Sequence, residues 1–375
     1  MEIRLARRDE DKACNDFHNR IYGDNRTLEQ WQWGYFLEAF QTDKIPFAVV
    51  EDKGKIVGTQ AFIPIRLINK DGIFWTAKSE DTLVDPDYRG QKLFEKMYDL
   101  LFTYLDENDL HCIWGFTPAT KSFIRLGFEI PGTISQLFMP FSNDAIIRAI
   151  RSQLPSPKSK PLSLLKRTSY KAATVAGRVV SCLKFSGIES KLKNKSNLDK
   201  INITITDTAP AQAGELCQAF IKKYGGITIY RDAAFIKWRL LDNPFIKSII
   251  KTAHVDGELV GWIAYTHAPD GMGYVIDWIA AHKDDAIVHD TLLLLLKEAV
   301  TDMRQTGAVG LRFWKATTHP FDELASDIAK KSGFFHIKRG YTTVLYINEN
   351  SDRKNQLSDY QNWFINRTFT QGCYG

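Results

Sequence analysis

The sequence lacks most features that mark an exported, metal-binding or membrane-embedded protein. It has no CxxC pair and no cluster of Cys with His, so neither a disulfide framework nor a zinc site is indicated. Its longest leucine run, Leu292 to Leu296, is far too short to cross a bilayer. The first residues, Met1 to Arg4, lack the apolar run of a signal peptide. We therefore expect a cytoplasmic protein without a bound metal. The five cysteines are scattered along the chain: Cys14, Cys112, Cys182, Cys217 and Cys373.

Charges of both signs are present, but their distribution is uneven. The chain has 375 residues, 44% hydrophobic and 25% charged, which are ordinary values for a globular protein of two domains. Residues 151–200 hold 12 Lys or Arg and only two acids, a local net charge of +10. The other residues therefore sum to −5, and the overall charge of +5 arises from this one segment.

Apolar periodicity predicts two similar runs of elements. Residues 2–141 favour a strand, two helices, a hairpin with its turn at Glu51 to Lys55, a long strand, a loop, a helix from Leu93, a strand, a short helix and a closing strand at 135–141. The second of the two helices is led by Thr27 with Gln30 three positions on, which is a capping-box pattern. Residues 201–347 repeat this order. We interpret the chain as a duplicated α/β (α+β) fold, in which each half is a mixed, mostly antiparallel sheet flanked by helices. The expected domains are 1–142, a basic helical linker 143–200, and 201–375.

The segment from Leu83 to Phe94 connects a predicted strand to a predicted amphipathic helix. Its sequence is Leu-Val-Asp-Pro-Asp-Tyr-Arg-Gly-Gln-Lys-Leu-Phe, a proline turn followed by an Arg-Gly pair and the first turn of the helix. The first amides of a helix lack internal partners, and the helix dipole favours negative charge there. The segment is therefore a candidate phosphate site.

Two segments resemble the GNAT N-acetyltransferases, namely 83–91 and 119–129, the latter Ala-Thr-Lys-Ser-Phe-Ile-Arg-Leu-Gly-Phe-Glu. In that family the first segment follows the fourth strand and binds the pyrophosphate of acyl-CoA, and the second lies beside the thioester. The resemblance covers residues 1–141 by motif and 201–347 by element order. It is similar to bacterial two-domain members, some of them found with cell-surface polysaccharide genes. It implies acetyl-CoA or another acyl-CoA as co-substrate, bound by Leu83, Val84, Arg89, Gly90, Gln91, Lys92, Leu93, Phe94 and Phe123.

Three positions depart from the family pattern. Lys92 and Phe94 stand where the family has a glycine and a small residue, and glycine normally allows the backbone to approach phosphate closely. Many members carry a tyrosine that protonates the departing thiolate, and Phe123 occupies that position here. Either water or another group supplies that proton, or this half performs no acyl transfer.

Acyl transfer to an amine also needs a proton acceptor and a donor for the oxyanion. Glu80 and Asp81 precede the turn on the same predicted strand and should point to opposite faces. Either of them is a candidate base, with Glu80 preferred, and a solvated carboxylate at a strand edge is the alternative for both. The backbone of Leu83 and Val84 is placed to contact the acyl-CoA.

The second half has no Arg-Gly turn before its long helix, so we expect a degenerate copy that shapes the acceptor site. The basic segment 158–200 has three interpretations. It is a solvated helix face between domains, a surface for anionic lipid, or a nucleic-acid contact, in that order.

The sequence therefore predicts an acyl-CoA-dependent N-acyltransferase whose acceptor is a small-molecule primary amine, with an amino sugar as the first choice by family analogy. The alternatives are an aminoacyl-tRNA-dependent or long-chain acyl transferase, and a non-catalytic binding protein that kept the fold. The oligomeric state is not predicted.

Overall fold

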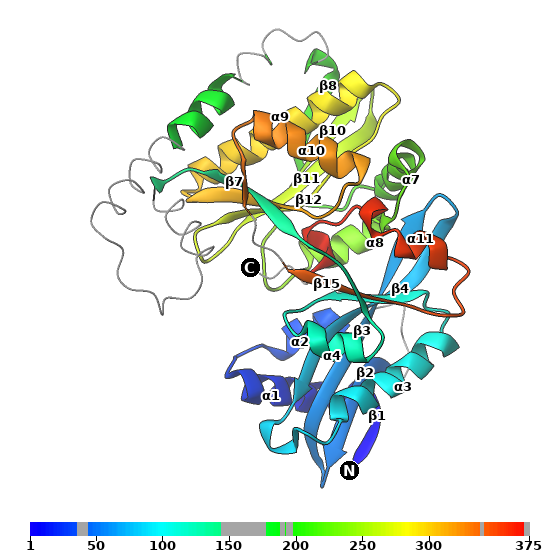
Figure 1. Ribbon diagram of the computed structural model, residues 1–375. Helices are drawn as coiled ribbons and strands as arrows, with labels where there is room; N and C mark the ends of the chain where they lie inside the picture. Colours follow the sequence, from blue (N-terminus) through cyan, green and yellow to red (C-terminus); the bar gives the residue numbers. More distant parts are fainter. Residues whose placement is uncertain (36–43, 144–177, 188–191, 193–197, 338–340, 371–375) are drawn as a thin grey trace, which may run out of the picture.

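The computed structural model describes residues 1–35, 44–143, 178–187, 192, 198–337 and 341–370, and these form two sheets, each flanked by helices (Figure 1). This is the predicted fold class. None of the described helices is long and apolar enough to cross a membrane.

The first sheet has the strand order β1-β2-β3-β4-β5-β15-β6, and the two-residue β9 pairs with β3. Its helices are α1 (Asp11–Tyr22), α2 (Leu28–Tyr35), α3 (Leu93–Glu107) and α4 (Thr120–Arg125). Its strands are β1 (Glu2–Arg7), β2 (Lys44–Asp52), β3 (Lys55–Asn69), β4 (Gly72–Val84), β5 (Cys112–Phe116), β6 (Glu129–Thr133), β9 (Thr228–Ile229) and β15 (Thr342–Ile347).

The second sheet has the order β14-β7-β13-β12-β11-β10-β8. Its helices are α7 (Ala213–Tyr224), α8 (Ala233–Ile236), α9 (Asp285–Gln305) and α10 (Pro320–Lys331), and the short α11 (Lys354–Ser358) follows β15. Its strands are β7 (Ser135–Pro140), β8 (Ile201–Thr206), β10 (Ile249–Val255), β11 (Glu258–His267), β12 (Gly273–Ala280), β13 (Gly310–Lys315) and β14 (Phe335–Ile337).

Each half gives strands to the sheet of the other half, and besides the two-residue β9 these are β7 and β15. β7, expected to close the first half, pairs with β13 and β14 of the second sheet. β15 in turn lies between β5 and β6 of the first sheet. The prediction that 135–141 closes its own half is therefore wrong, because periodicity shows that a strand exists but not which strand it pairs with. The division at 142 and 201 stays a prediction, and most of 143–200 lies outside the described residues.

The two halves meet in a reciprocal contact between two tryptophans. Trp33 of α2 and Trp238 each lie six residues after a helix N-cap, Thr27 and Asp232. Each indole donates a hydrogen bond to the backbone carbonyl of the other tryptophan, at 2.8 and 2.9 Å. A reciprocal contact of this kind is the mark of an isologous interface. The predicted capping box at Thr27 is also confirmed, since its backbone N–H donates to Gln30 Oε1 at 2.9 Å.

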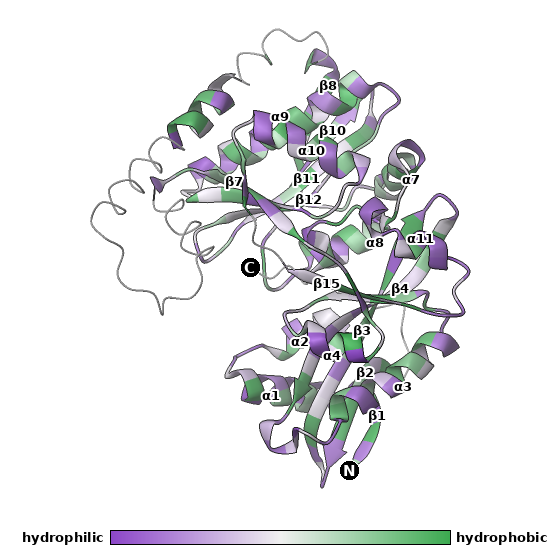
Figure 2. Cartoon of the chain, in the orientation of Figure 1, coloured by the Kyte–Doolittle hydropathy of each residue, from purple (hydrophilic) through white to green (hydrophobic). Residues whose placement is uncertain are grey.

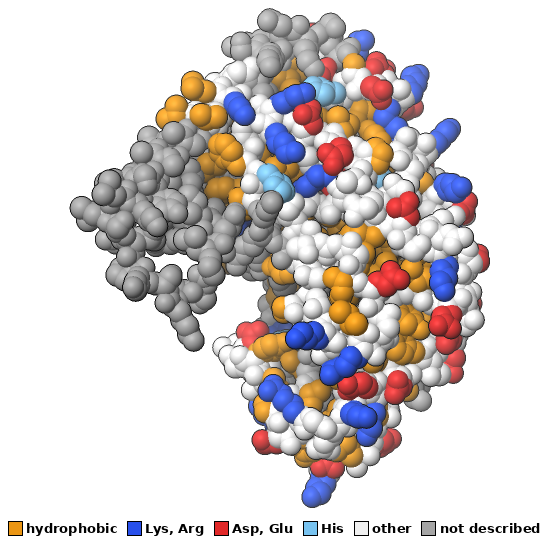
Figure 3. Space-filling view, in the orientation of Figure 1, with side chains coloured by type: hydrophobic (Ala, Val, Ile, Leu, Met, Phe, Trp, Pro, Cys, Tyr) orange, Lys and Arg blue, Asp and Glu red, His pale blue; other side chains and the backbone are white. Residues whose placement is uncertain are grey.

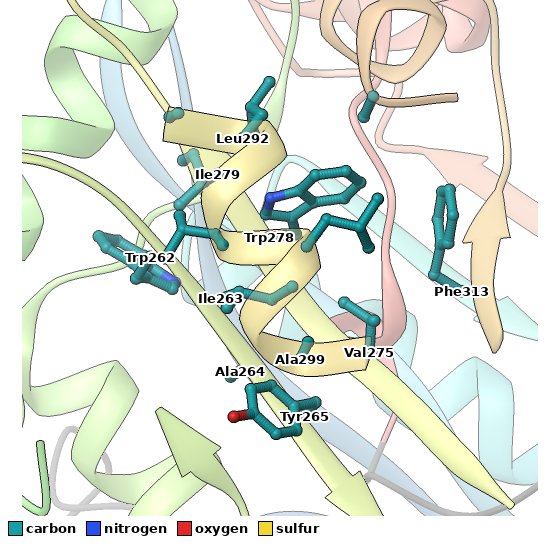
Figure 4. Packing of buried hydrophobic residues seen from close by; sticks show 14 of the residues in the cluster. Trp262, Ile263, Ala264, Tyr265, Val275, Trp278, Ile279, Leu292, Ala299 and Phe313 are labelled. Carbon is teal, nitrogen blue, oxygen red and sulfur yellow. The ribbon is translucent and has the colours of Figure 1, made fainter. Parts of the chain in front are cut away.

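The core of the second half lies where α9 packs over β11 and β12 (Figure 4). β12 is buried at all its positions, which explains its continuous apolar sequence. The hydropathy colouring shows apolar residues along the strands of both sheets and a mixture of polar and apolar residues in the helices (Figure 2).

Candidate functional site

A cavity opens where two parallel strands of the first sheet diverge. β4 pairs with β5 at Ala77↔Ile113 and Lys78↔Trp114, and the recorded pairing goes no further toward the carboxyl ends. The cavity beyond this point has a volume of about 440 Å³. Its lining comes from α1, β4, α3, β5, the loop after β5, α4 and β15: Tyr22, Ser79, Glu80, Asp81, Thr82, Phe94, Gly115, Phe116, Thr117, Pro118, Ala119, Ser122, Phe123 and Val344.

A β-bulge in β4 forms one wall of this cavity. The pairing of β3 with β4 shifts by one residue between Ala61↔Glu80 and Thr59↔Leu83, and Asp81 has a left-handed φ of +50°. The Gln60 amide opposite the bulge donates to the carbonyls of Ala61 at 2.8 Å and Glu80 at 3.2 Å. The bulge breaks the strict alternation of side chains. The expectation that Glu80 and Asp81 point to opposite faces is therefore wrong, because both line the cavity.

The two candidate carboxylates have different partners. Glu80 forms an ion pair with Lys78, whose side chain is almost fully buried, while about a third of the Glu80 side chain is exposed. Asp81 is largely buried, and its Oδ2 accepts a hydrogen bond from Arg26 Nη1 at 2.8 Å. Only Glu80 thus combines solvent access with a place on the cavity wall.

Charged and polar neighbours control the protonation of Asp81. Burial by itself would raise the pKa of this carboxyl. The contact with His18, whose Nδ1 lies 3.5 Å from Oδ1, and the charge of Arg26 outweigh burial and hold the pKa well below its usual range. A carboxylate of such low basicity is a poor proton acceptor near neutral pH.

The predicted phosphate turn follows β4 directly. Asp85 is its buried anchor, because its side chain accepts the N–H of Asp87 at 3.2 Å and lies 3.1 Å from Arg20 Nη1. Gly90 and Lys92 both have left-handed backbones, at φ +81° and +56°. The segment from Arg89 through Gly90 and Gln91 to Lys92 is exposed.

No side chain caps the helix that begins at this turn. Lys92 is the N-cap of α3, and it makes no capping hydrogen bond with its side chain. Leu93 is buried, whereas Phe94 in the same first turn lines the cavity. The first turn of α3 therefore reaches from the N-terminus without a side-chain cap to the wall of the cavity.

Leu83 and Val84 do not appear among the cavity-lining residues. Leu83 is buried, and Val84 packs partly buried near α3. They lie between the bulge and the turn, and the cavity wall is made by the residues just before them. Their contact with acyl-CoA stays a prediction.

Phe123 lies in an aromatic cluster at the edge of the cavity. Its ring centroid is 5.5 Å from Phe94, 5.8 Å from Tyr98 and 5.0 Å from Phe128. The Tyr98 hydroxyl lies 2.6 Å from Ser79 Oγ on the cavity wall, and burial raises the Tyr98 pKa above its usual range.

Several hydroxyl groups in the wall were not predicted from the sequence: Tyr22, Ser79, Thr82, Thr117 and Ser122. The spacing of His18 and Tyr22, four residues apart, places both on one face of α1, which was an available signal. The others come from loops and short elements whose positions depend on the tertiary fold.

The second half contains a matching pair of parallel strands. β12 and β13 also pair at two positions, Gly273↔Leu311 and Tyr274↔Arg312. Trp278 and Phe313 follow these positions on the two strands, and their rings meet edge to face at 5.7 Å (Figure 4).

The corresponding helix of this half begins differently as well. The side chain of Asp284 caps α9 by accepting the Ala286 N–H at 2.8 Å, and Asp285 adds a second acid. This terminus therefore carries the wrong charge for a phosphate.

Within the described part of the chain, no group of His, Cys, Asp and Glu is arranged to hold a metal ion. Most of the basic segment 158–200 lies outside the described residues. On the face in Figure 3, Lys and Arg side chains are interspersed with Asp and Glu over both halves, with no large region of one sign.

Comparison with known proteins identifies the first half. A family model of the acetyltransferase (GNAT) domain matches residues 2–130. No curated protein sequence matches the chain.

Solved structures share the fold at low sequence identity. In three of them the aligned region covers 92% of this chain, and it covers 72%, 72% and 71% of the other chain. They are a protein of unknown function from Enterococcus faecalis V583, described as a probable N-acyltransferase (10% identity, TM-score 0.60), and GCN5-related N-acetyltransferases from Anabaena variabilis (12%, 0.59) and Kribbella flavida (11%, 0.55). Residues 2–130 of the chain therefore match the acetyltransferase (GNAT) domain family, and the chain has the fold of these N-acyltransferase structures.

Proposed function

We propose that the first half transfers an acyl group, acetyl in the simplest case, from acyl-CoA to a primary amine. The observation that carries this proposal is the cavity between the diverging ends of β4 and β5, beside a helix terminus without a side-chain cap. A thioester arm that enters between these strands reaches the bulge, while its phosphates lie at the turn.

The turn supplies the contacts to phosphate. The backbone amides of Gly90, Gln91 and Leu93 precede or begin α3, and the dipole of α3 favours an anion there. Arg89 and Lys92 add two exposed positive charges. The positive charge of Lys92 compensates for the missing glycine, and Phe94 borders the acyl end of the cavity instead of the phosphates.

Glu80 is the proposed general base. It lies on the cavity wall, partly exposed and ion-paired with Lys78. In the reaction the carboxylate takes a proton from the ammonium of the acceptor, directly or through water, and the neutral amine attacks the thioester carbon. Attack forms the C–N bond, and the carbonyl oxygen gains the negative charge. The C–S bond breaks when the carbonyl forms again, and the proton that the nitrogen then loses neutralises the departing thiolate, directly or through water. An amino sugar remains the proposed acceptor by family analogy.

Calorimetry with acetyl-CoA tests the binding step. We expect micromolar binding to the wild type and weaker binding to Arg89→Ala. Lys283→Ala is a matched control, because Lys283 is exposed in the corresponding loop before α9. The absence of binding at millimolar acetyl-CoA would remove the proposal.

A thiol-release assay over a panel of amines and amino sugars tests the chemistry. Glu80→Gln keeps the shape of the side chain but cannot accept a proton, so we expect kcat to fall about 100-fold or more with acetyl-CoA binding unchanged. Normal turnover by this variant would refute the role of Glu80. Binding without turnover on any amine would favour the non-catalytic alternative.

A further inference from the structure

The same buried ion pair occurs once in each half of the chain. Arg26 Nη1 lies 2.8 Å from Asp81 Oδ2, and the two side chains are 7% and 11% exposed. Arg231 Nε lies 3.0 and 3.1 Å from the two carboxylate oxygens of Asp277, and both side chains are fully buried.

The two pairs occupy equivalent places in the fold. Each arginine stands directly before the residue that caps the next helix, Thr27 in the first half and Asp232 in the second. In each half, the strand that carries the aspartate begins to pair with the neighbouring parallel strand at one residue, Ala77 or Gly273. The aspartate lies four positions after that residue. The pair therefore belongs to the duplicated fold and is not special to the half with the cavity.

The second pair, Arg231 with Asp277, shows the structural role of this contact. Asp277 also accepts hydrogen bonds from Trp262 Nε1 at 3.0 Å and Asn366 Nδ2 at 2.5 Å. There the carboxylate ties a loop to the sheet, and it does not line the cavity between β4 and β5.

The first pair differs in its backbone. Asp81 is left-handed at φ +50°, whereas Asp277 is not among the positive-φ residues of the described chain. Left-handed backbone is unfavourable for residues with a Cβ, although less so for Asp than for most others, and surrounding contacts can enforce it. Arg26 is itself held to α1, since its Nε donates to Asn15 Oδ1 at 2.9 Å and its backbone N–H donates to Asn19 Oδ1 at 3.0 Å.

We propose that Arg26 is a positioning residue that holds Asp81 in its left-handed conformation, and thereby sets the bulged backbone that walls the cavity, while Asp81 takes no proton from the substrate. This inference rests on the proposed function where it predicts changes in kcat. The structural part, that the ion pair supports a strained backbone, does not depend on that function and is tested by the melting temperature.

Two substitutions at one position separate a backbone role from a chemical role. Glycine adopts φ +50° without a steric cost, whereas alanine does not. We expect Asp81→Gly to retain about tenfold more kcat than Asp81→Ala, with the KM for acetyl-CoA similar in both. If Asp81 were the base, the two variants would lose activity equally, and that result would overturn the proposal.

Arginine variants test the other side of the pair. Arg26→Gln is expected to lower kcat by about tenfold, and Arg26→Lys to restore part of the loss, because a lysine keeps the charge but not the planar geometry. Asp277→Asn is the matched control, since it weakens the equivalent pair, which does not line the cavity. It should lower the melting temperature and leave kcat unchanged; a comparable loss of kcat in Asp277→Asn would overturn the local role.

Thermal unfolding distinguishes failure of this inference from failure of the proposed function. Asp81→Gly should melt about 3 °C higher than Asp81→Ala whether or not the protein turns over acetyl-CoA. If the melting order holds and no variant or wild type binds acetyl-CoA, the ion-pair role survives and the proposed function fails. Equal melting temperatures, or a reversed order, would refute the ion-pair role itself.

Discussion

Replacing Lys92 by glycine should change stability and ligand affinity in opposite directions. Lys92 lies at φ +56° at the N-cap of α3, a conformation that costs a residue with a Cβ about 1–2 kcal/mol. Glycine removes that cost but loses about 0.5–1 kcal/mol of extra chain entropy on folding. The net stabilisation is therefore about 0.5–1 kcal/mol, or about 1–3 °C in melting temperature.

The same change removes a positive charge from the proposed phosphate site. Lys92 is exposed, so its contact with a phosphate is screened, and we estimate its contribution at about 1 kcal/mol, a roughly fivefold loss of affinity for acetyl-CoA. Calorimetry at low and high salt measures this loss. The difference from wild type should shrink at 1 M salt, where the Debye length is about 3 Å.

Two further variants separate the two effects. Lys92→Ala loses the charge but keeps the unfavourable backbone, so it should bind weakly without being stabilised. Lys53→Gly is the matched control, because Lys53 is an exposed lysine at φ +49° in the β2–β3 turn. It should stabilise the protein and leave binding unchanged. If Lys92→Gly is stabilised yet binds acetyl-CoA like wild type, then Lys92 does not contact the phosphates.

Three other predictions follow from the described contacts. Phe123→Tyr should raise kcat in a thiol-release assay, because Phe123 lines the cavity at the family's proton-donor position; an unchanged kcat would show that another group supplies the proton. Burial lowers the His319 pKa to about 4, so this histidine stays neutral in the folded protein near neutral pH. The free energy of unfolding should therefore fall as pH falls from about 6.5 through 4, by up to about 3 kcal/mol, because the unfolded chain binds the proton more tightly. Urea unfolding at pH 7, 5 and 4 should show less acid sensitivity in His319→Asn than in wild type, and equal sensitivity would contradict the assignment. Asp284→Ala should cost about 1 kcal/mol through loss of the α9 cap without weakening acetyl-CoA binding, and weaker binding would place a ligand site in the second half.

Local patterns predicted most of the elements correctly. The apolar spacing from Leu93 matches α3, and the hairpin signal around Gly54 matches the β2–β3 turn. The cap at Thr27 was predicted with its partner, because capping depends on residues three positions apart. The short strands β6, β9 and β14 were missed, since two to five residues carry too little periodicity to be recognised.

The candidate site was predicted only along one strand and the turn after it. The residues from Glu80 to Phe94 are contiguous in sequence, so a motif identifies them together. The wall contributed by Tyr22, Thr117 and Ser122 comes from three other segments. Asp81 could not be distinguished from Glu80 as a base, because its partner Arg26 lies 55 positions away.

The sequence by itself determined the elements, their duplicated order and the turn between β4 and α3, because helix and strand periods, caps and glycine conformations act over a few residues. Only the tertiary structure decided that β7 and β15 exchange sheets, that a bulge turns both Glu80 and Asp81 toward one cavity, and that Arg26 neutralises one of them. These features depend on contacts between segments tens to hundreds of residues apart, and such contacts are selected by the burial of whole sheet faces rather than by local preference.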